Sequence, residues 1–252
     1  RQAAKNRKIT SIVAAMAEGT NLNDFKTKFP ARFFDTGIAE EHAVTFASGL
    51  AMAGFKPFVC VYSTFMQRAF DQAVHDAGIH NLPVVFALDR AGIVGEDGAT
   101  HHGIFDIAFM RMIPNMTVLA PSDGDELIKM TAYAAARKKG PVSLRFPRGA
   151  AHAPFKKISR SIVTGKSRKI RNGDSVTILS LGSMLQYAVA AANLLEKNTG
   201  KKADIIDARF AKPYDKNAVL RSVKKTGRLL TVEEGCIAGG FGQAAALDAA
   251  RA

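Results

Sequence analysis

Apolar runs of strand length alternate along the chain with longer segments of helical period. The strand-like runs are KPFVCVY (56–62), LPVVFALD (82–89), MTVLAP (116–121) and PVSLRF (141–146). Their nearly continuous Val, Leu and Phe content is typical of parallel strands that are buried on both faces. Helices are predicted between them, from about 41 to 53 and from about 64 to 78. A third helix opens at PSDGDELIKM, where Ser122 is the predicted N-cap and Asp125 stands three residues later.

The alternation stops at 148–174, a stretch with Pro, Gly and a basic cluster, and then starts again. Strands are predicted at 175–182, 202–210 and 227–235, with a helix at 184–198 and the first turns of another in GGFGQAAALDAARA. The fold class is therefore α/β, with two domains that are each a mostly parallel sheet flanked by helices. We expect one domain at 1–150, a linker at 151–173, and a second, incomplete domain at 174–252.

Composition and charge limit the classes of function. The apolar fraction of 47% is enough to bury real cores. No apolar run approaches membrane-spanning length and the N-terminus lacks a signal peptide core, so a soluble protein without a membrane partner is expected. The net charge of +13 lies in short clusters without interleaved aromatics, which favours anionic small molecules over nucleic acid. Cys60 and Cys236 show no CxxC spacing, so neither a disulfide framework nor a thiolate zinc site is expected.

The stretch DTGIAEEHAV (35–44) places two carboxylates and a histidine at the start of a predicted helix. Glu40 and Glu41 would point about 100° apart on that helix, and neither has the i, i+4 spacing of HExxH, so a metal site is not expected. Two interpretations stay open from these residues alone. The acids either stabilise the helix N-terminus through its dipole, or one of them is a catalytic carboxylate.

The loop DRAGIVGEDGATHHGIFD (89–106) follows a predicted strand, so it leaves the sheet at the carboxyl edge where α/β folds bind their ligands. It contains the titratable residues Arg90, Glu96, Asp97, His101 and His102, and it matches neither a Walker loop nor GxGxxG. Its histidines either transfer protons and bind substrate, or bind a metal. Adjacent histidines rarely bind one ion together, so the metal is the less favoured interpretation.

A third segment, VYSTFMQRAFDQAVHD (61–76), places Tyr62, Phe65 and Arg68 at another strand end. An exposed aromatic beside an arginine suits a flat ring next to an anion, while ordinary packing of Phe65 under the helix is the alternative. LRFPRGA places Arg148 after a further strand. Arg68, Arg90 and Arg148 thus come from three separate strand ends, and this layout could surround one phosphate.

Three motifs together, GIAEEHAVTFASG, YSTFMQRAFDQ and DRAGIVGEDGATHHG, closely resemble the pyrimidine-binding domain of the 1-deoxy-D-xylulose-5-phosphate synthases, which are thiamine-diphosphate enzymes of the transketolase superfamily. The similarity extends from about 8 to the end of the chain, and VEEG...GGFG near 232–242 is similar to the superfamily's third domain. The resemblance implies condensation of pyruvate with D-glyceraldehyde 3-phosphate to 1-deoxy-D-xylulose 5-phosphate and CO2, for isoprenoid, thiamine and pyridoxal biosynthesis.

The resemblance also implies roles at the cofactor. Glu40 matches the glutamate that hydrogen-bonds a ring nitrogen of the aminopyrimidine and favours its imino tautomer. Phe65 matches the aromatic that stacks on the pyrimidine, and Arg68 lies in the same motif. Glu41 stands where the family usually has glutamine.

For the substrates, the resemblance implies that Tyr62, Arg90 and Arg148 bind the phosphate of the acceptor, with Asp97 near its hydroxyl. His101 matches the residue that engages pyruvate-derived intermediates and helps to move protons. The second histidine of THHG, at 102, stands where the family often has glutamine and receives no role.

The GDG...N motif, which in the family holds Mg2+ and the diphosphate, does not occur in this sequence. We therefore expect a fragment of a longer enzyme that is inactive alone, with thiamine diphosphate as cofactor and Mg2+ bound mainly by the missing N-terminal domain. A homodimer is expected, in the bacterial cytoplasm or in the plastid stroma of a plant or alga. The alternatives are a transketolase or another thiamine-diphosphate enzyme, and a non-catalytic dimerisation module.

Overall fold

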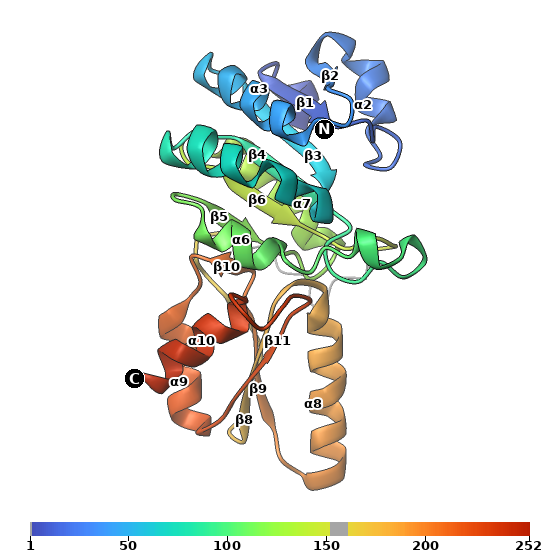
Figure 1. Ribbon diagram of the computed structural model, residues 1–252. Helices are drawn as coiled ribbons and strands as arrows, with labels where there is room; N and C mark the ends of the chain where they lie inside the picture. Colours follow the sequence, from blue (N-terminus) through green and yellow to red (C-terminus); the bar gives the residue numbers. More distant parts are fainter. Residues whose placement is uncertain (1, 152–160) are drawn as a thin grey trace.

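Two sheets follow one another along the long axis of the molecule, and helices flank both of them (Figure 1). The structure is a computed structural model that describes residues 2–151 and 161–252. Each sheet is mostly parallel, with one antiparallel strand at its edge. The predicted fold class is confirmed.

The larger sheet has seven strands in the order β10-β5-β6-β4-β3-β1-β2. Only β10, which pairs with β5, runs antiparallel to its neighbour. The strands are β1 (Ile9–Val13), β2 (Phe33–Asp35), β3 (Lys56–Tyr62), β4 (Val85–Asp89), β5 (Thr117–Leu119), β6 (Val142–Arg145) and β10 (Phe210–Lys212).

Helical segments connect these strands. They are α1 (Gln2–Lys5), α2 (Asn23–Lys28), η1 (Pro30–Arg32), α3 (Glu40–Met52), α4 (Ser63–Met66), η2 (Gln67–Ala69), α5 (Phe70–Gln72), η3 (Ala73–Ile79), η4 (Gly95–Asp97), η5 (Ala99–His101), α6 (Asp106–Met112) and α7 (Gly124–Ala136). The single helix predicted at 64–78 is therefore a succession of α, 3₁₀, α and π turns.

The smaller sheet has four strands in the order β11-β8-β9-β7. They are β7 (Arg168–Arg171), β8 (Val176–Ser180), β9 (Ala203–Asp207) and β11 (Leu229–Val232), and the connecting segments are η6 (Gly182–Met184), α8 (Leu185–Thr199), α9 (Lys216–Thr226) and α10 (Phe241–Ala250). In Figure 1, α8 lies on one side of this sheet, and α9 and α10 lie on the other.

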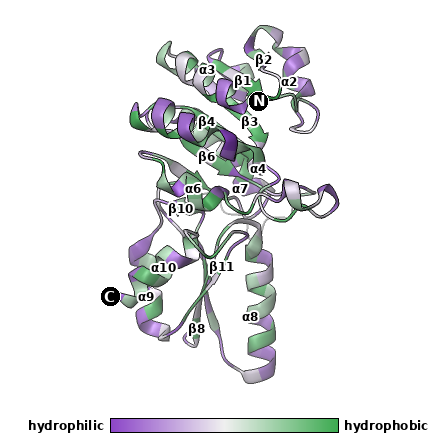
Figure 2. Ribbon diagram, viewed as in Figure 1, coloured by the Kyte–Doolittle hydropathy of each residue, from purple (hydrophilic) through white to green (hydrophobic). Residues whose placement is uncertain are grey.

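Strand alternation divides the buried side chains between the two faces of each sheet. In the smaller sheet, Ile178 packs with α8, whereas the next residue, Leu179, belongs to the core that α9 and α10 share with the larger sheet. In the larger sheet, Met130 of α7 covers the opposite face from α3 and α6. Figure 2 shows the strands of the larger sheet mostly in the hydrophobic colour, whereas α8 and α9 mix hydrophobic and hydrophilic residues.

The region between the sheets differs from the predicted linker. Residues 168–171, expected within the linker at 151–173, form β7 and pair with β9. Residues 152–160 of the same predicted linker lie outside the described part of the chain. The division into domains at 150 and 174 stays a prediction, and β10 shows that the later half of the chain also contributes to the larger sheet.

Two further predictions fail at this boundary. The strand expected at 202–210 ends at Asp207, because Arg209 adopts a φ of +61° and turns the chain towards β5. The N-cap of α7 is Asp123, whose side chain accepts a hydrogen bond from the Glu126 N–H at 2.8 Å. Ser122 instead donates to Asp207 and accepts from Arg168, because the second half of the chain brings both groups to it.

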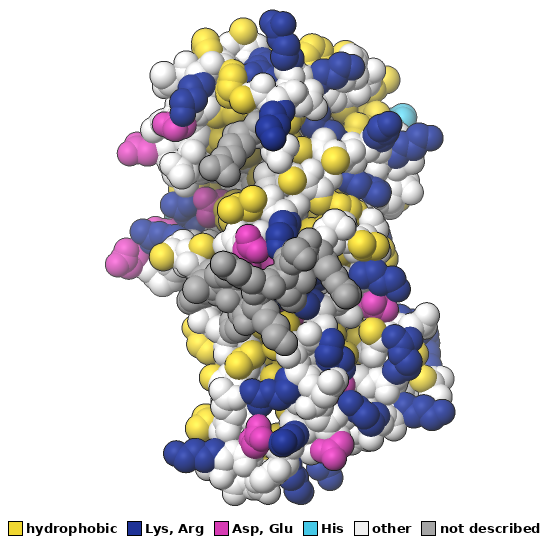
Figure 3. Space-filling model, turned by 180° about the vertical axis from the view of Figure 1, so that it is seen from behind, with side chains coloured by type: hydrophobic (Ala, Val, Ile, Leu, Met, Phe, Trp, Pro, Cys, Tyr) yellow, Lys and Arg dark blue, Asp and Glu magenta, His cyan; other side chains and the backbone are white. Residues whose placement is uncertain are grey.

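Lys and Arg side chains are spread over the described part of the face shown in Figure 3, from one end of the molecule to the other. This distribution agrees with the scattered basic clusters of the sequence. Within 2–151 and 161–252, no helix combines the length and the apolar content needed to cross a membrane.

Candidate active site

The predicted site residues lie along the carboxyl edge of the larger sheet, in an order that the strands impose. The sheet order β6-β4-β3-β1-β2 is parallel throughout. The segments that follow these strands therefore leave the sheet side by side. Arg148 follows β6 and Arg90 follows β4. The segment 62–68 begins at the last residue of β3, and Glu40 follows β2. These groups therefore form a row across the edge.

Glu40, at one end of this row, is a buried carboxylate with one free oxygen. It is the first residue of α3 and is 3% exposed, whereas Glu41 is exposed. Its Oε1 accepts a hydrogen bond from Nη1 of Arg68 at 2.8 Å, while its Oε2 is buried and has no partner among the described residues. A buried acceptor without a donor costs about 1–3 kcal/mol, so an N–H or O–H of a bound ligand would be stabilising at this oxygen.

A continuous aromatic surface joins Glu40 to the loop after β4. The guanidinium of Arg68 lies 4.7 Å from the centre of the Phe65 ring, which is nearly parallel to the ring of Tyr62 at 5.9 Å. The guanidinium of Arg90 in turn lies 3.8 Å from the centre of Tyr62. The His101 ring meets Phe65 edge-on at 5.3 Å. Cations over ring faces and edge-on ring pairs are both favourable, so the row of rings is held in a defined geometry.

Asp97 gathers two of the three predicted arginines. Nη1 of Arg148 lies 3.1 Å from its Oδ1, and Nε of Arg90 lies 3.6 Å from its Oδ2. Arg68 is not part of this group, because its partner is Glu40. The structure thus brings Arg90 and Arg148 together and separates them from the third arginine. A phosphate would contact two guanidinium groups here, with the half-exposed Arg148 able to turn towards it.

Burial changes the proton affinity of two groups beside Arg90. Desolvation raises the pKa of Tyr62 above its ordinary value, and the nearby Arg90 partly opposes this rise. Tyr62 therefore keeps its phenolic proton at neutral pH and can act as a donor. Desolvation also raises the pKa of Asp89, again against the effect of Arg90. Gly19 lies directly against the Tyr62 hydroxyl, because a Cβ at position 19 would be 2.0 Å from that oxygen.

Hydrogen bonds within the loop after β4 position His101. Gly92 and Gly103 exchange two backbone hydrogen bonds of 2.8 Å, which join the two ends of the loop. Between them, Nδ1 of His102 accepts from the Val94 N–H at 3.2 Å. Sequence reasoning gave His102 no role, and the structure shows that it supports the loop that carries its neighbour.

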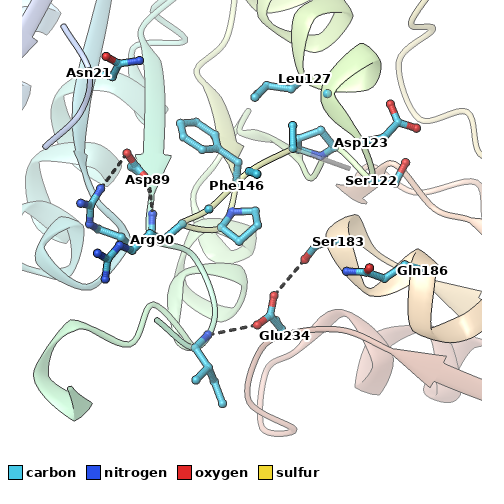
Figure 4. Close-up of a pocket in the computed structure, with 18 of the residues that line it drawn as sticks. Asn21, Asp89, Arg90, Ser122, Asp123, Leu127, Phe146, Ser183, Gln186 and Glu234 are labelled. Carbon is cyan, nitrogen blue, oxygen red and sulfur yellow. Dashed lines mark hydrogen bonds and ion pairs between the residues drawn. The ribbon is translucent and has the colours of Figure 1, made fainter. Parts of the chain in front are cut away.

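A cavity of about 610 Å³ lies between this edge and the second half of the chain. Asp89, Arg90 and Arg148 line it from one side, and Ser183 and Glu234 line it from the other. Figure 4 shows the Glu234 side chain extending from the second half towards both Ser183 and the loop. Sequence reasoning did not select Glu234. The available signal was a pair of acids directly after a strand, at the edge where parallel sheets place their ligand groups.

The metal prediction is not tested. Within the described ranges, no group of three or more His, Cys, Asp or Glu side chains is arranged to hold an ion. The expectation that Mg2+ is bound elsewhere in a complete enzyme stays a prediction.

The fold and the site together define an α/β protein whose parallel-sheet edge suits a flat ring with a hydrogen-bonding nitrogen, next to a second compartment for an anion. Comparison with protein families makes this class specific. The family model for the transketolase pyrimidine-binding domain matches residues 1–153, and that for the transketolase C-terminal domain matches 165–251. The chain belongs to the transketolase family.

Curated relatives are similar over nearly the whole chain. A 1-deoxy-D-xylulose-5-phosphate synthase of Thermomicrobium roseum is 51% identical over 243 residues, which are 96% of this chain and 38% of the relative. The synthase of Halothermothrix orenii is 50% identical over 241 residues, 95% of this chain and 38% of the relative. The chain therefore spans a little over a third of the length of these relatives.

Solved structures agree with this fold. One is described as a split gene transketolase, inactive beta4 tetramer, where beta4 does not refer to a strand. It superposes with a TM-score of 0.88 at 33% identity, and the match covers 99% of this chain and 81% of that chain. The transketolase of Campylobacter jejuni has a TM-score of 0.78 at 20% identity, covering 96% of this chain and 42% of its own, and it supports the fold alone.

Proposed function

We propose that this chain is the pyrimidine-binding and C-terminal part of a 1-deoxy-D-xylulose-5-phosphate synthase. The complete enzyme would condense pyruvate with D-glyceraldehyde 3-phosphate and release CO2. Identities near 50% to synthases over more than nine-tenths of the chain support this assignment. The structural observation that carries it, as a thiamine-diphosphate enzyme, is the free, buried Oε2 of Glu40, whose Oε1 is linked through Arg68 to the ring of Phe65.

These residues fit the aminopyrimidine of thiamine diphosphate. A protonated or tautomeric ring nitrogen would donate to Oε2 of Glu40 and satisfy the one oxygen that lacks a donor. The face of Phe65 already carries a flat polar group, the guanidinium of Arg68, so this ring suits stacking with a flat polar heterocycle. Arg68 is half exposed, so a shift of its guanidinium away from the Phe65 face that keeps the hydrogen bond to Oε1 of Glu40 would leave no buried cavity.

When bound, thiamine diphosphate supplies the carbon nucleophile and the electron sink for decarboxylation. Glu40 would hold the ring nitrogen through a hydrogen bond at Oε2, and Arg68 fixes the carboxylate through Oε1. His101 stands beside Phe65 and exchanges protons with the substrate at its imidazole nitrogens. Thr100 lies 3.0 Å from Nδ1 of His101, which leaves Nε2 as the nitrogen for the substrate.

The acceptor would bind in the second compartment. Arg90 and Arg148 supply two guanidinium groups for its phosphate, and the protonated hydroxyl of Tyr62 donates a further hydrogen bond. Asp97, which holds both arginines now, would accept from a hydroxyl of the acceptor once the phosphate takes over its partners. The proposed cofactor residues thus lie at one end of the row along the sheet edge, and the proposed acceptor residues lie at the other.

Several properties belong to the whole enzyme and form part of this proposal. The chain alone would be inactive, since it spans 38% of its synthase relatives. Mg2+ would come with the remaining part of the enzyme, and the complete enzyme would act as a homodimer in the bacterial cytoplasm.

The test is a chimaera in which this chain replaces the matching region of the Thermomicrobium roseum synthase. It should form 1-deoxy-D-xylulose 5-phosphate from pyruvate and glyceraldehyde 3-phosphate. Glu40→Gln should lower kcat by about 10²–10⁴-fold, the range for loss of a positioned proton-transfer group. Glu41→Gln is the matched control, because this neighbour is exposed, and it should retain activity.

Calorimetry with thiamine diphosphate separates the alternatives. No binding by the folded chimaera would favour a non-catalytic dimerisation module. A chimaera that binds the cofactor and uses ketose phosphates in place of pyruvate would be a transketolase, the second candidate, which the 33% identity to the split-gene transketolase supports. Full activity of Glu40→Gln would refute the role of this carboxylate.

A further inference from the structure

The segment that follows β11 reaches across the cavity and contacts the loop that carries the predicted substrate residues. Oε1 of Glu234 accepts a hydrogen bond from the Ile93 N–H at 3.2 Å, and its Oε2 accepts from the Ser183 hydroxyl at 3.0 Å (Figure 4). Ile93 follows β4 of the larger sheet, whereas Glu234 and Ser183 belong to the second half of the chain. A single carboxylate therefore joins the two halves beside the candidate acceptor site.

The same segment holds the far end of the loop. Nη2 of Arg145 donates to the backbone carbonyl of Glu234 at 2.9 Å, and its Nε donates to Asp106 at 2.7 Å. Both side chains of this ion pair are nearly fully buried. The Cys236 N–H also donates to the carbonyl of Ile104 at 3.1 Å. The loop from 90 to 106 is thus attached to this one segment near its beginning and at its end.

Gly92 shows how closely the carboxylate approaches the loop. A Cβ at this position would lie 2.5 Å from Cδ of Glu234, and Gly92 has a φ of +87°. Both the contact and the backbone conformation favour glycine here. The neighbouring Ala91 N–H donates to the carbonyl of Phe146, two residues before Arg148. The start of the loop is therefore attached on one side to the segment that carries Arg148 and on the other side to Glu234.

We propose that Glu234 is a positioning residue for acceptor binding, and that it acts by fixing the backbone between Arg90 and Asp97. This inference rests on the proposed function, because it assigns the phosphate of the acceptor to Arg90 and Arg148. Both carboxylate oxygens of Glu234 already accept hydrogen bonds from Ile93 and Ser183, so in this proposal it acts through the loop and not on the reacting atoms. Its effect should therefore fall on the Michaelis constant for the phosphorylated acceptor, and the Michaelis constant for pyruvate should change little.

Three variants of the chimaera test this role. Glu234→Ala removes both hydrogen bonds and should raise KM for glyceraldehyde 3-phosphate about tenfold or more, since small displacements of positioning groups can cost up to about 10²-fold. Glu234→Gln should stay within about twofold of the parent, because its amide oxygen can accept from Ile93 and its amide nitrogen can donate to Ser183. Gly92→Ala should resemble Glu234→Ala, because its methyl group displaces the carboxylate. Glu196→Ala is the control, an acidic residue on the exposed surface of the same half.

A second readout does not depend on activity. Hydrogen exchange of the 252-residue chain should show faster exchange of the 91–98 amides in Glu234→Ala, and unchanged exchange in Glu234→Gln and Glu196→Ala. If the chimaera is inactive but the exchange result holds, the proposed function fails while the bracing of the loop by Glu234 stands. If Glu234→Ala leaves both the exchange and the acceptor KM unchanged, or raises both Michaelis constants equally, the positioning role is overturned.

Discussion

Substitution of Glu126 tests the contact that joins the two halves of the chain behind the site. Nε and Nη2 of Arg209 donate to Oε2 and Oε1 of Glu126 at 2.8 and 2.7 Å. Glu126 belongs to α7 of the larger-sheet half, and Arg209 follows β9 of the smaller sheet. Both side chains are buried, and Arg168 adds a second guanidinium at 3.7 Å from Oε1. Glu126→Ala therefore leaves the buried charge of Arg209 without its two acceptors.

The expected loss of stability is large. Removing one partner of a buried ion pair costs about 3–5 kcal/mol, because the remaining charge stays desolvated. With a slope near the upper end for urea, about 3 kcal/mol per M, the unfolding midpoint should fall by about 1–1.7 M. The matched control is Asp125→Ala on the same helix, which removes a surface pair with Lys129. Exposed pairs contribute about 0.2–1 kcal/mol, so this midpoint should move by less than about 0.4 M.

Urea titration followed by far-UV circular dichroism measures both effects, since the chain has no Trp. The double variant Glu126→Leu with Arg209→Met should recover most of the loss, because neither charge then remains buried. Equal midpoint shifts for Glu126→Ala and Asp125→Ala would refute the claim that this pair couples the two halves.

Two further predictions concern titrating groups. Burial raises the pKa of the Cys60 thiol to about 12, so in the folded chain a thiol reagent should modify the partly exposed Cys236 first and Cys60 only on unfolding; rapid reaction of both would contradict this. Burial also raises the pKa of Asp207 to about 6, from an ordinary value of 3.8. The folded state therefore binds this proton more tightly than the unfolded state does. As the pH rises from about 4 to 6, the free energy of unfolding relative to Asp207→Asn should fall by up to about 3 kcal/mol, and above pH 6 it should stay constant. A flat difference in denaturation midpoint across this range would show that burial does not control the titration.

Hydrophobic pattern predicted the strands with continuous apolar runs and missed those with polar residues in the run or with pairing that nothing local specifies. The strand expected at 56–62 is β3 with the same bounds. β1 was not predicted, because Thr10 and Ser11 interrupt its apolar run, yet both are 2% exposed between β2 and β3. Only Phe210 of β10 was predicted as strand, at the end of 202–210, since nothing local in the sequence specifies that Phe210 pairs with Leu119 of the larger sheet. These failures share a cause, which is that long-range pairing decides the register.

The α9 helix illustrates the complementary limit. It runs from Lys216 to Thr226 and was not predicted, although its apolar residues have helical spacing, with Val219 buried and Val223 packed against the core. Its start is nevertheless local, because the Asp215 side chain caps the Ala218 N–H. At α7 the serine next to the true cap was a plausible choice, and only the approach of Arg168 and Asp207 explains why it is not used.

At the candidate site, angular spacing separated the two adjacent acids correctly before any partner was known. Glu40 is buried and Glu41 is exposed, as expected for side chains that point about 100° apart on one helix. The sequence did not specify which arginine would meet the buried acid. That choice depends on two features of the fold. Arg68 belongs to η2, which follows β3, and β3 lies two places from β2 in the sheet. Helix α3 passes over β1 and packs against η2. Arg90 and Arg148 follow strands on the other side of β3, so the strand order separates the carboxylate proposed to bind the cofactor ring from the two arginines proposed to bind the phosphate.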